Sequence, residues 1–263
     1  MSSDLRECIG VLIITYNEAP NIDRTLSKLQ WAHRIVIVDS GSNDGTQRIV
    51  GQHRNAHIVH HPFDSFDAQC NFGLGHSMLD SEWVLSLDAD YVLSDALVEE
   101  LGRLRPPADI AGYRARFEYA IFGQTIRGGV YPPVVVLFRK KGARYVADGH
   151  AHRVLVDGGV GELSGCIYHD DRKPLSRWLD SQRSYARHEA DHIARSSGAM
   201  RWQDRIRTLI GVAPVFMFVY VYLIRGAILD GRQGLYYALQ RAYAELLLSI
   251  ELLDRRLRGG SGD

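Results

Sequence analysis

The sequence predicts an α/β fold, in which a mostly parallel, Rossmann-like sheet flanked by helices is followed by a C-terminal helical hairpin. Three apolar runs, Ile9–Thr15, Arg34–Asp39 and Trp83–Leu93, have the length and β-branched content of buried strands. Segments with helical spacing separate these runs, and such alternation is typical of βαβ crossovers. At 263 residues and 46% hydrophobic content, the chain can bury a full core.

Polar breaks after the strands mark loops and helix starts. Pro20 and Asn21 favour a helix after the first strand, and Asp44 or Thr46 can cap the helix after the second. The remaining expected elements are strands at Ala56–His60, Gly112–Tyr119, Val134–Arg139 and Ser164–His169, a helix near Ser94–Leu104, a hairpin turn around Asp157–Gly159 and a long helix after Pro174.

The run Trp83–Leu93 (WVLSLDADYVL) carries two carboxylates, Asp88 and Asp90, one residue apart. Ligands of open α/β sheets bind at the carboxyl ends of the strands, where we expect both aspartates to lie. Carboxylates this close repel each other unless a cation or a proton neutralises them, so a divalent metal on a diphosphate would suit the pair. The alternative is that one of them caps the helix near Ser94.

Four segments, ITYNEAPNI, IVIVDSGSNDGT, QCNFGLGHS and WVLSLDAD, together resemble the nucleotide-sugar-binding half of inverting family 2 glycosyltransferases, which have the GT-A fold. The resemblance implies a GT-A catalytic domain at residues 1–171, with a nucleotide-sugar half at 1–105 and an acceptor half at 106–171. It also implies inverting transfer of a sugar from a nucleotide-sugar donor, with Mg²⁺ or Mn²⁺ as the cofactor.

The resemblance assigns roles to individual residues. The implied nucleotide-sugar contacts are Thr15, Asn17, Glu18, Asp39, Ser42, Asn71, Gly73 and Asp88, and the implied metal ligands are Asp88 and Asp90. Independently, an ionised Asp39 can accept a hydrogen bond from the imide N–H of uracil or thymine, which favours a UDP- or dTDP-sugar. For Asn17 and Asn71 the alternative is turn formation, which short polar side chains favour.

The loop and strand at residues 122–139 resemble RHGGWYP…RLFR in the lipopolysaccharide-core glucosyltransferase branch of this family. The branch implies a cell-envelope acceptor, either lipopolysaccharide core or a polyprenyl-diphosphate-linked saccharide. Arg127 and Tyr131 are then implied to contact the donor phosphate or the acceptor sugar. The alternative is that they only pack the loop.

An inverting transferase needs a general base at the acceptor hydroxyl. The segment Tyr145–Val154 (YVADGHAHRV) offers Asp148, His150 and His152. The lipopolysaccharide-core branch has the pattern V-H-E-x-V here, and this chain departs from it at the glutamate. We expect Asp148 to be the base and His150 to lie near the metal or phosphate, unless both residues only shape a turn.

Residues 172–258 are expected to form a helical region, and residues 259–263 a disordered tail. As a helix the uncharged run Leu209–Ile224 would reach about 24 Å, short of the roughly 30 Å hydrocarbon core of a bilayer. Gly234 is expected to separate it from a second helix, Leu235–Leu257, which carries an apolar stripe. Tyrosines and basic flanks favour a hairpin at a membrane interface. A soluble core or a homodimer interface is the alternative.

The composition of the chain indicates which other partners and which cellular compartment to expect. The formal net charge is zero, which argues against a nucleic-acid partner because the global basic footprint is missing. The first residues carry no basic and apolar signal pattern. We therefore expect a cytoplasmic protein, peripheral to the inner face of the cell membrane.

Two other functions fit parts of the sequence. LDADYVL matches the D-x-D-x-V signature of haloacid-dehalogenase-like phosphatases, in which Asp88 would be the nucleophile. Those enzymes usually open with that strand, whereas three predicted strands precede it here. The second alternative is a non-catalytic protein that only binds nucleotide sugars, if no base is present.

Overall fold

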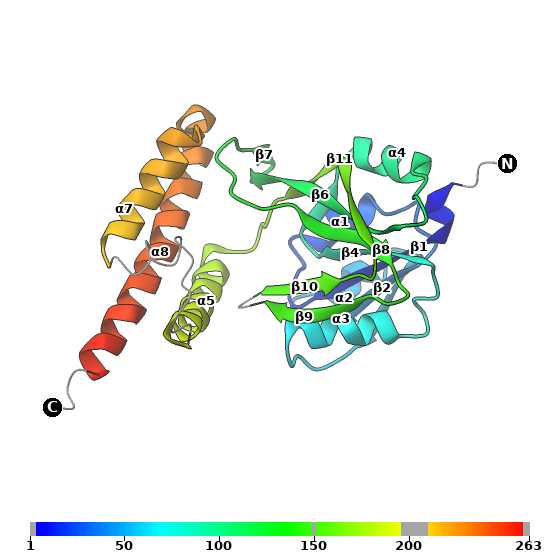
Figure 1. Ribbon diagram of the computed structural model, residues 1–263, viewed down its shortest axis with the longest axis horizontal. Coiled ribbons are helices and arrows are strands. Elements are labelled where there is room, and N and C mark those ends of the chain that lie inside the picture. The colour runs from blue at the N-terminus through cyan, green and yellow to red at the C-terminus, as the bar shows by residue number, and fades with distance from the viewer. Residues whose placement is uncertain (1–3, 149–150, 196–209, 260–263) are drawn as a thin grey trace. The chain divides into compact units, whose positions relative to one another are not determined.

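The structure is a computed structural model that describes residues 4–148, 151–195 and 210–259 (Figure 1). The chain forms two compact units. The first comprises Met1–Ala120 and Tyr131–Arg172, and the second comprises Ile121–Val130 and Lys173–Asp263. The short segment Ile121–Val130, which the sequence places in the acceptor half, thus belongs to the second unit.

The first unit is built on one mixed sheet with the strand order β3-β2-β1-β4-β8-β6-β11-β5. Its strands are β1 (Ile9–Thr15), β2 (Ile35–Asp39), β3 (Ala56–His60), β4 (Trp83–Asp88), β5 (Tyr91–Leu93), β6 (Ile110–Ile121), β8 (Val134–Arg139) and β11 (Gly159–His169). The first four strands in the order are parallel, and β8 is antiparallel to both β4 and β6. The predicted α/β fold is confirmed.

Helices cover both faces of the parallel half of the sheet. The helices of this unit are η1 (Leu5–Cys8), α1 (Ile22–Ser27), α2 (Thr46–Val50), α3 (Phe66–Gly75) and α4 (Asp95–Arg103). In β1, Val11 and Ile13 pack in the cluster that includes Leu26 of α1, whereas Leu12 packs with Cys70 of α3. Because alternate side chains enter different cores, β1 reads as a continuous apolar run.

The run Trp83–Leu93 was predicted to contain a buried parallel strand that ends at the two carboxylates, and β4 does end at Asp88. The second strand in this run, β5, was not predicted. The chain breaks after β4, which pairs in parallel with β1, and resumes as β5, which pairs antiparallel with β11. The helix-cap alternative for Asp88 and Asp90 is wrong, because the hydroxyl of Ser94 accepts the backbone N–H of Leu97 and caps α4.

The expected hairpin around Asp157–Gly159 is absent from the described residues. The strand β10 (Ala151–Leu155) pairs with β9 (Arg144–Asp148) in a separate two-stranded sheet, whereas β11 pairs with β6. Leu163 and Ile167 of β11 lie in the main core, and burying them requires this strand to join the large sheet.

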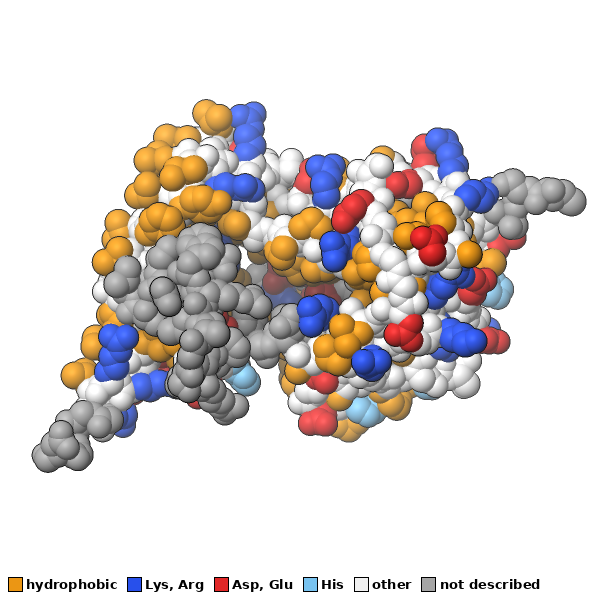
Figure 2. Space-filling model, in the orientation of Figure 1, with side chains coloured by type: hydrophobic (Ala, Val, Ile, Leu, Met, Phe, Trp, Pro, Cys, Tyr) orange, Lys and Arg blue, Asp and Glu red, His pale blue; other side chains and the backbone are white. Residues whose placement is uncertain are grey.

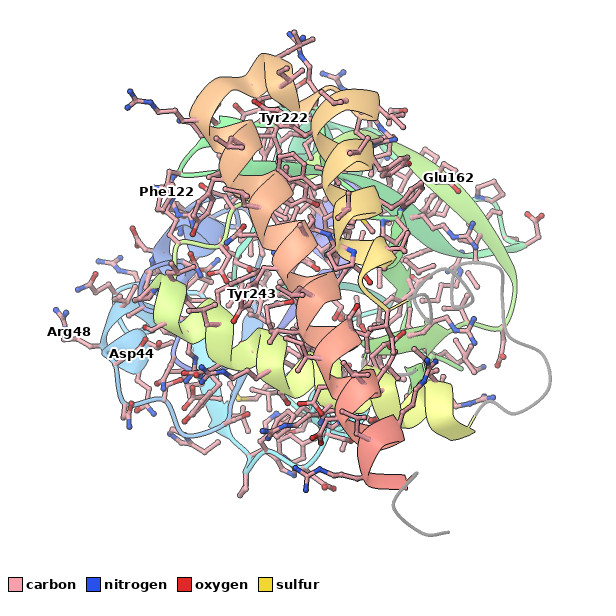
Figure 3. The ribbon with its side chains drawn as sticks, turned by 90° about the vertical axis from the view of Figure 1, so that its left-hand side faces the viewer. Asp44, Arg48, Phe122, Glu162, Tyr222 and Tyr243 are labelled. Atoms are coloured by element: carbon pink, nitrogen blue, oxygen red, sulfur yellow. The ribbon has the colours of Figure 1, made fainter. Side chains whose placement is uncertain are left out.

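The second unit is helical, as predicted. It contains the short strand β7 (Gln124–Thr125), α5 (Leu175–Arg195), α7 (Val212–Val219), a π-helical turn η2 (Tyr220–Ile224), η3 (Ala227–Asp230) and α8 (Gly231–Gly259). Figures 1 and 3 show α7 beside α8, and α5 also packs on α8. Pro214 lies in the first turn of α7, where a missing N–H costs no helical hydrogen bond.

The turn between α7 and α8 differs from the prediction. Gly226 (φ 80°) and Gly231 (φ 62°) take left-handed conformations there, and Gly234 is inside α8. A Cβ at Gly234 would lie 1.8 Å from the carbonyl oxygen of Ala227, so this glycine permits close backbone packing. Within the described residues, no single helix could cross a membrane by its length and hydropathy. The pair Val212–Ile224 and Ala227–Arg258 meets that criterion only together, with a bend of 69°.

Gly73 should be essential for the packing of α3 on the sheet. A Cβ there would lie 2.4 Å from Leu12 Cδ1 and 3.0 Å from Val38 Cγ2. We expect Gly73→Ala to lower the free energy of unfolding by about 1–3 kcal/mol through overpacking, measured by urea denaturation. The control is Gly75→Ala in the same helix, where a Cβ meets nothing within 4 Å. Equal losses in the two variants would contradict the packing role.

Candidate active site

Three predicted site residues meet at the carboxyl edge of the parallel strands. Thr15, at the end of β1, is in register with Asp39 at the end of β2, and the preceding Ile14 is in register with Asp88 of β4. The hydroxyl of Thr15 is buried and has no hydrogen-bond partner among the described residues. In a parallel sheet this edge is the usual ligand-binding position.

The loops that follow β1 and β2 are linked to each other. The backbone N–H of Asn17 donates to Ser42 Oγ at 2.8 Å, and Asn17 Oδ1 accepts the N–H of Asn43 at 2.8 Å. Asn17 has a φ of 56°, a conformation that asparagine tolerates better than most residues. The backbone N–H of Glu18 donates to Thr46 Oγ1 at 2.8 Å. Two loops separated in sequence therefore form one rigid surface.

Asp44 extends this link between the loops. Its carboxylate accepts the backbone N–H of Ala19 at 3.0 Å and that of Thr46 at 3.0 Å. Burial raises the pKa of Asp44, but the Thr46 hydroxyl and these N–H groups outweigh burial and lower the pKa overall. The N-cap of α2 is Gly45, without a side-chain cap hydrogen bond, so the prediction that Asp44 or Thr46 caps this helix is wrong. Asp44 instead joins the two loops.

Asp39 is fully buried, and its carboxylate accepts hydrogen bonds from the loop and helix that follow it. Its carboxylate accepts the backbone N–H of Gly41 at 3.2 Å, the N–H of Ser42 at 3.0 Å and Gln47 Nε2 at 3.0 Å, and it also accepts the Ser42 hydroxyl. These bonds keep the loop after β2 in a fixed shape. Contact of Asp39 with a nucleotide base stays a prediction.

Asn71 and Gly73, on α3, have structural contacts in this unit. The amide of Asn71 donates to the Tyr145 carbonyl oxygen at 3.0 Å and accepts the Tyr145 N–H at 2.8 Å, which fixes β9 on α3. Gly73 is buried against β1 and β2. Their implied nucleotide contacts stay predictions.

His169 lies beside Asp90, a contact that the sequence did not predict. Asp88 is half-buried and Asp90 is buried, and His169 Nε2 lies 3.1 Å from Asp90 Oδ2. Burial disfavours protonation of His169, but the charges of Asp90 and Asp88 outweigh it and raise the pKa of the imidazole. The signal was the tripeptide His169-Asp170-Asp171 at the end of a predicted strand.

The donor atoms at this edge suit Mg²⁺ or Mn²⁺. Two carboxylates and an imidazole are ligands that Mn²⁺ accepts, and carboxylates and water suit Mg²⁺. The buried Nδ1 of His169 has no hydrogen-bond partner among the described residues. In that part of the chain no set of three or more acidic, histidine or cysteine side chains is already arranged around a metal position. The chemistry of the donors fits such a cation.

Aromatic side chains surround His169. Its ring centroid lies 5.2 Å from that of Tyr91, 4.7 Å from that of Tyr119 and 5.3 Å from that of Tyr131. The hydroxyls of Tyr91 and Tyr131 are 2.6 Å apart. Tyr131, implied to contact the donor phosphate or the acceptor, thus lies beside the carboxylate pair, where an aromatic face could pack on a sugar ring.

A buried ion-pair network fixes the segment that follows His169. Asp170 Oδ2 lies 3.1 Å from Arg24 Nη1 and 2.8 Å from Arg172 Nη2, and the Asp170 side chain is almost fully buried. Asn21 Nδ2 donates to Asp171 Oδ1 at 2.8 Å and also to Glu18 Oε2 at 2.8 Å. The end of β11 is therefore held to the start of α1, and through Glu18 to the loop after β1.

Comparison with known proteins relates this chain to glycosyltransferases. Residues 10–119 match the family described as "Glycosyl transferase family 2". The chain is 27% identical over 256 residues to the lipopolysaccharide core biosynthesis glycosyltransferase LpsC of Rhizobium meliloti, covering 94% of this chain and 92% of that protein. Residues 10–119 thus form a glycosyl transferase family 2 domain. The family match spans the strand on which the phosphatase alternative rested.

Two further proteins are similar to this glycosyltransferase over different lengths of the chain. It is 28% identical over 174 residues to the poly-beta-1,6-N-acetyl-D-glucosamine synthase of Staphylococcus epidermidis, covering 53% of this chain and 41% of that protein. It aligns with the crystal structure of S. aureus TarS 1-349 in complex with UDP over 96% of this chain and 91% of that chain, with 14% identity and a TM-score of 0.49.

The structure does not test the roles of three other predicted site residues of the glycosyltransferase. Arg127 belongs to the second unit, where its backbone N–H donates to Asp230 Oδ2 at 2.7 Å and its side chain lies 3.7 Å from Asp230 Oδ1. Asp148 ends β9, and its side chain lies outside the described part of the structure, as does His150 entirely. The phosphate contact of Arg127 and the roles of Asp148 and His150 stay predictions.

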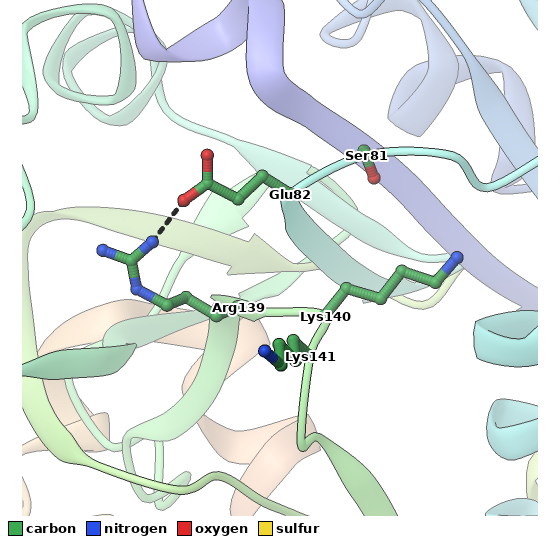
Figure 4. A pocket seen from close by; sticks show the side chains of 5 residues that line it. All are labelled: Ser81, Glu82, Arg139, Lys140 and Lys141. Carbon is green, nitrogen blue, oxygen red and sulfur yellow. Dashed lines mark hydrogen bonds and ion pairs between the residues drawn. The ribbon is translucent and has the colours of Figure 1, made fainter.

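The glycosyltransferase also has an open pocket of about 470 Å³ at the amino end of β4 (Figure 4). It is lined by Ser81, Glu82, Arg139, Lys140 and Lys141. Arg139 forms an ion pair with Glu82 and stacks 4.5 Å from the centroid of the Trp83 ring, and Lys140 donates to the Leu79 carbonyl oxygen. Most of its cationic groups thus already have partners, and the pocket lies at the edge opposite the carboxylates.

The buried network around Asp170 should stabilise the glycosyltransferase fold. Asp170→Asn removes the charge that faces Arg24 and Arg172, so we expect the free energy of unfolding to fall by about 1–3 kcal/mol. Asp95→Asn is the control, because its ion pair with Lys28 is on the surface and should contribute less than about 1 kcal/mol. Denaturant unfolding measures both. A loss at Asp170 no larger than at Asp95 would show that the network is not structural.

Proposed function

We propose that this glycosyltransferase moves a sugar, with inversion, from a UDP- or dTDP-sugar to a cell-envelope acceptor. The observation that supports it most strongly is the shared edge at which Thr15, Asp39 and Asp88 end neighbouring parallel strands. Asp90 follows directly and contacts His169. A nucleotide diphosphate needs such a site, with polar loops at one end and carboxylates at the other.

The proposed cofactor is Mg²⁺ or Mn²⁺, held by Asp88 and Asp90. When bound there, such an ion would stabilise the negative charge that develops on the diphosphate leaving group. The protein's own contribution is to keep the ligands in place. The hydrogen bond from His169 orients Asp90, and the ion pairs of Asp170 fix the backbone next to His169.

The donor base and ribose are proposed to lie on the joined loops after β1 and β2. Asn17, Glu18 and Ser42 already hold these loops together through hydrogen bonds. Little further ordering is then needed when a donor binds, which favours affinity. Asp39 is proposed to select a pyrimidine, either through an imide hydrogen bond or by shaping the loop that makes one.

The acceptor is proposed to be lipopolysaccharide core or a polyprenyl-diphosphate-linked saccharide. The support is the similarity to LpsC over most of both chains, together with the exposed apolar helices of the second unit. On this proposal the enzyme works at the inner face of the cell membrane. Asp148 is proposed to take the proton of the acceptor hydroxyl, with His150 near the phosphate or metal.

Asp90→Ala tests the metal and donor site. We expect the variant to fold normally and to lose at least about 10²-fold in turnover of UDP- or dTDP-sugars with Mn²⁺, because charge stabilisation of the leaving group is lost. Product nucleotide released with and without acceptor measures this. Asp95→Ala, on the neighbouring helix and exposed, should behave as wild type. Unchanged turnover in Asp90→Ala would refute the site, and donor binding without any turnover in wild type would favour the non-catalytic alternative.

Asp148→Asn tests the general base. If Asp148 removes the acceptor proton, kcat should fall by roughly 10² or more while KM for the donor stays nearly constant. Steady-state transfer to a lipopolysaccharide-core acceptor measures both parameters. His150→Gln and His152→Gln are the comparisons. A wild-type kcat in Asp148→Asn together with a loss in one histidine variant would move the role of base to that histidine.

A further inference from the structure

The turn between α7 and α8 presents apolar side chains to solvent. We call residues 223–232 the hairpin tip. Ile224 and Leu229 are each 68% exposed, and Leu223 and Ile228 are about half exposed. Figure 2 shows hydrophobic side chains gathered over α7 and the start of α8 in this unit. An exposed apolar group of this kind indicates an interaction surface.

The hairpin tip is held in this form by the segment Ile121–Val130 of the same unit. Asp230 is buried and accepts the Arg127 N–H, and the Arg225 guanidinium donates to the Gly129 carbonyl oxygen at 2.9 Å. A Cβ at Gly128 would lie 2.7 Å from Ala227 Cβ, so the two chain segments are in close contact. Because these contacts fix the backbone, the exposure of Ile224 and Leu229 is a fixed feature of this unit.

The exposed charges of the hairpin tip are all positive. Arg225 and Arg232 are exposed, and Arg127 is exposed beside them in the same unit. Asp230 is the only acidic residue from Val212 to Leu235, and it is buried and paired with Arg127. Apolar side chains between cations match the chemistry of anionic phospholipid head groups over acyl chains.

The adjoining helix α7 and the turn η2 extend the apolar surface of the hairpin tip. From Val212 to Ile224 the chain carries no charge, yet Val215, Phe216 and Val219 are exposed. This stretch reaches about 20 Å, too short for the roughly 30 Å core of a bilayer. Such a segment suits shallow insertion rather than crossing.

We infer that the hairpin tip inserts into the head-group region of an anionic phospholipid bilayer, with Ile224 and Leu229 buried and Arg225 and Arg232 on the phosphates. The inference deepens the proposed function, on which it rests for the lipid-linked nature of the acceptor. The far end of α8 stays outside the bilayer. This helix of 29 residues is about 43 Å long, whereas an interfacial segment enters only about 5–10 Å.

The test is co-sedimentation of the full chain with vesicles. One set contains phosphatidylcholine alone and the other also contains phosphatidylglycerol. We expect wild type to bind the anionic vesicles and Ile224→Ser/Leu229→Ser to bind them at least about tenfold more weakly, because two buried apolar side chains are lost. Arg232→Gln should weaken binding by about fivefold, and only on anionic vesicles.

The matched control is Leu253→Ser/Leu257→Ser near the other end of α8, where Leu257 is 66% exposed. It should bind anionic vesicles as wild type does. Failure of wild type to bind these vesicles would overturn the inference, and so would an equal loss in the control, which would indicate contact along the whole of α8. A dimer in solution that only the Ile224→Ser/Leu229→Ser change dissociates, without vesicle binding, would assign the surface to a second copy.

The outcome is separable from that of the proposed function. Sugar transfer to a lipid-free core oligosaccharide should be the same in wild type and in Ile224→Ser/Leu229→Ser, since the hairpin tip contains no residue assigned to the chemistry. Vesicle binding without any transfer activity in wild type would refute the proposed function alone. Transfer without vesicle binding would refute the inference alone. Circular dichroism and a thermal melt show that each variant remains folded.

Discussion

The register of β1 between β2 and β4 is the constraint on which the candidate site depends. Because Thr15 pairs with Asp39 and Ile14 with Asp88, three strands end together, and their loops meet at one edge. A shift of one residue in either pairing would turn every side chain of that strand to the opposite face of the sheet. The apolar side chains of β1 pack in different clusters on the two faces, so both faces oppose such a shift. The same packing that stabilises the fold therefore positions the site.

Local patterns were sufficient to predict the parallel half of the sheet. Ile9–Thr15 and Ala56–His60 are strands with the bounds that the sequence indicated. Patterns failed where pairing between distant segments decides the structure. In Trp83–Leu93 the strand that ends at the carboxylates was predicted, but β5 was not, because Tyr91–Leu93 pair with the distant β11. No periodicity within eleven residues contains that information.

The same limit applies to the residues of the site. Asp39, Asp88 and Asp90 were predicted because a strand end marks each of them. His169 was not predicted as their neighbour, because its contact with Asp90 depends on the pairing of β11 with β5. Asn71 was predicted to contact the nucleotide, but the contact that the structure shows for it is a structural one. Its side chain satisfies the backbone of Tyr145, a contact 74 positions away that no motif indicates.

Buried aspartates hold the polar parts of both units, and their environments explain why they are tolerated. An isolated buried carboxylate would be costly, but Asp39 accepts backbone N–H groups, Asp170 faces two arginines and Asp230 accepts the N–H of Arg127 and lies beside its guanidinium. Each aspartate thus fixes an irregular segment that no helix or strand could hold. In the first unit the fixed segments are the loops at the carboxylate edge, and in the second unit the fixed segment is the hairpin tip. Loops without such internal hydrogen bonds and ion pairs would be mobile. A buried, paired aspartate in each of these segments therefore keeps the exposed surface next to it in a single conformation.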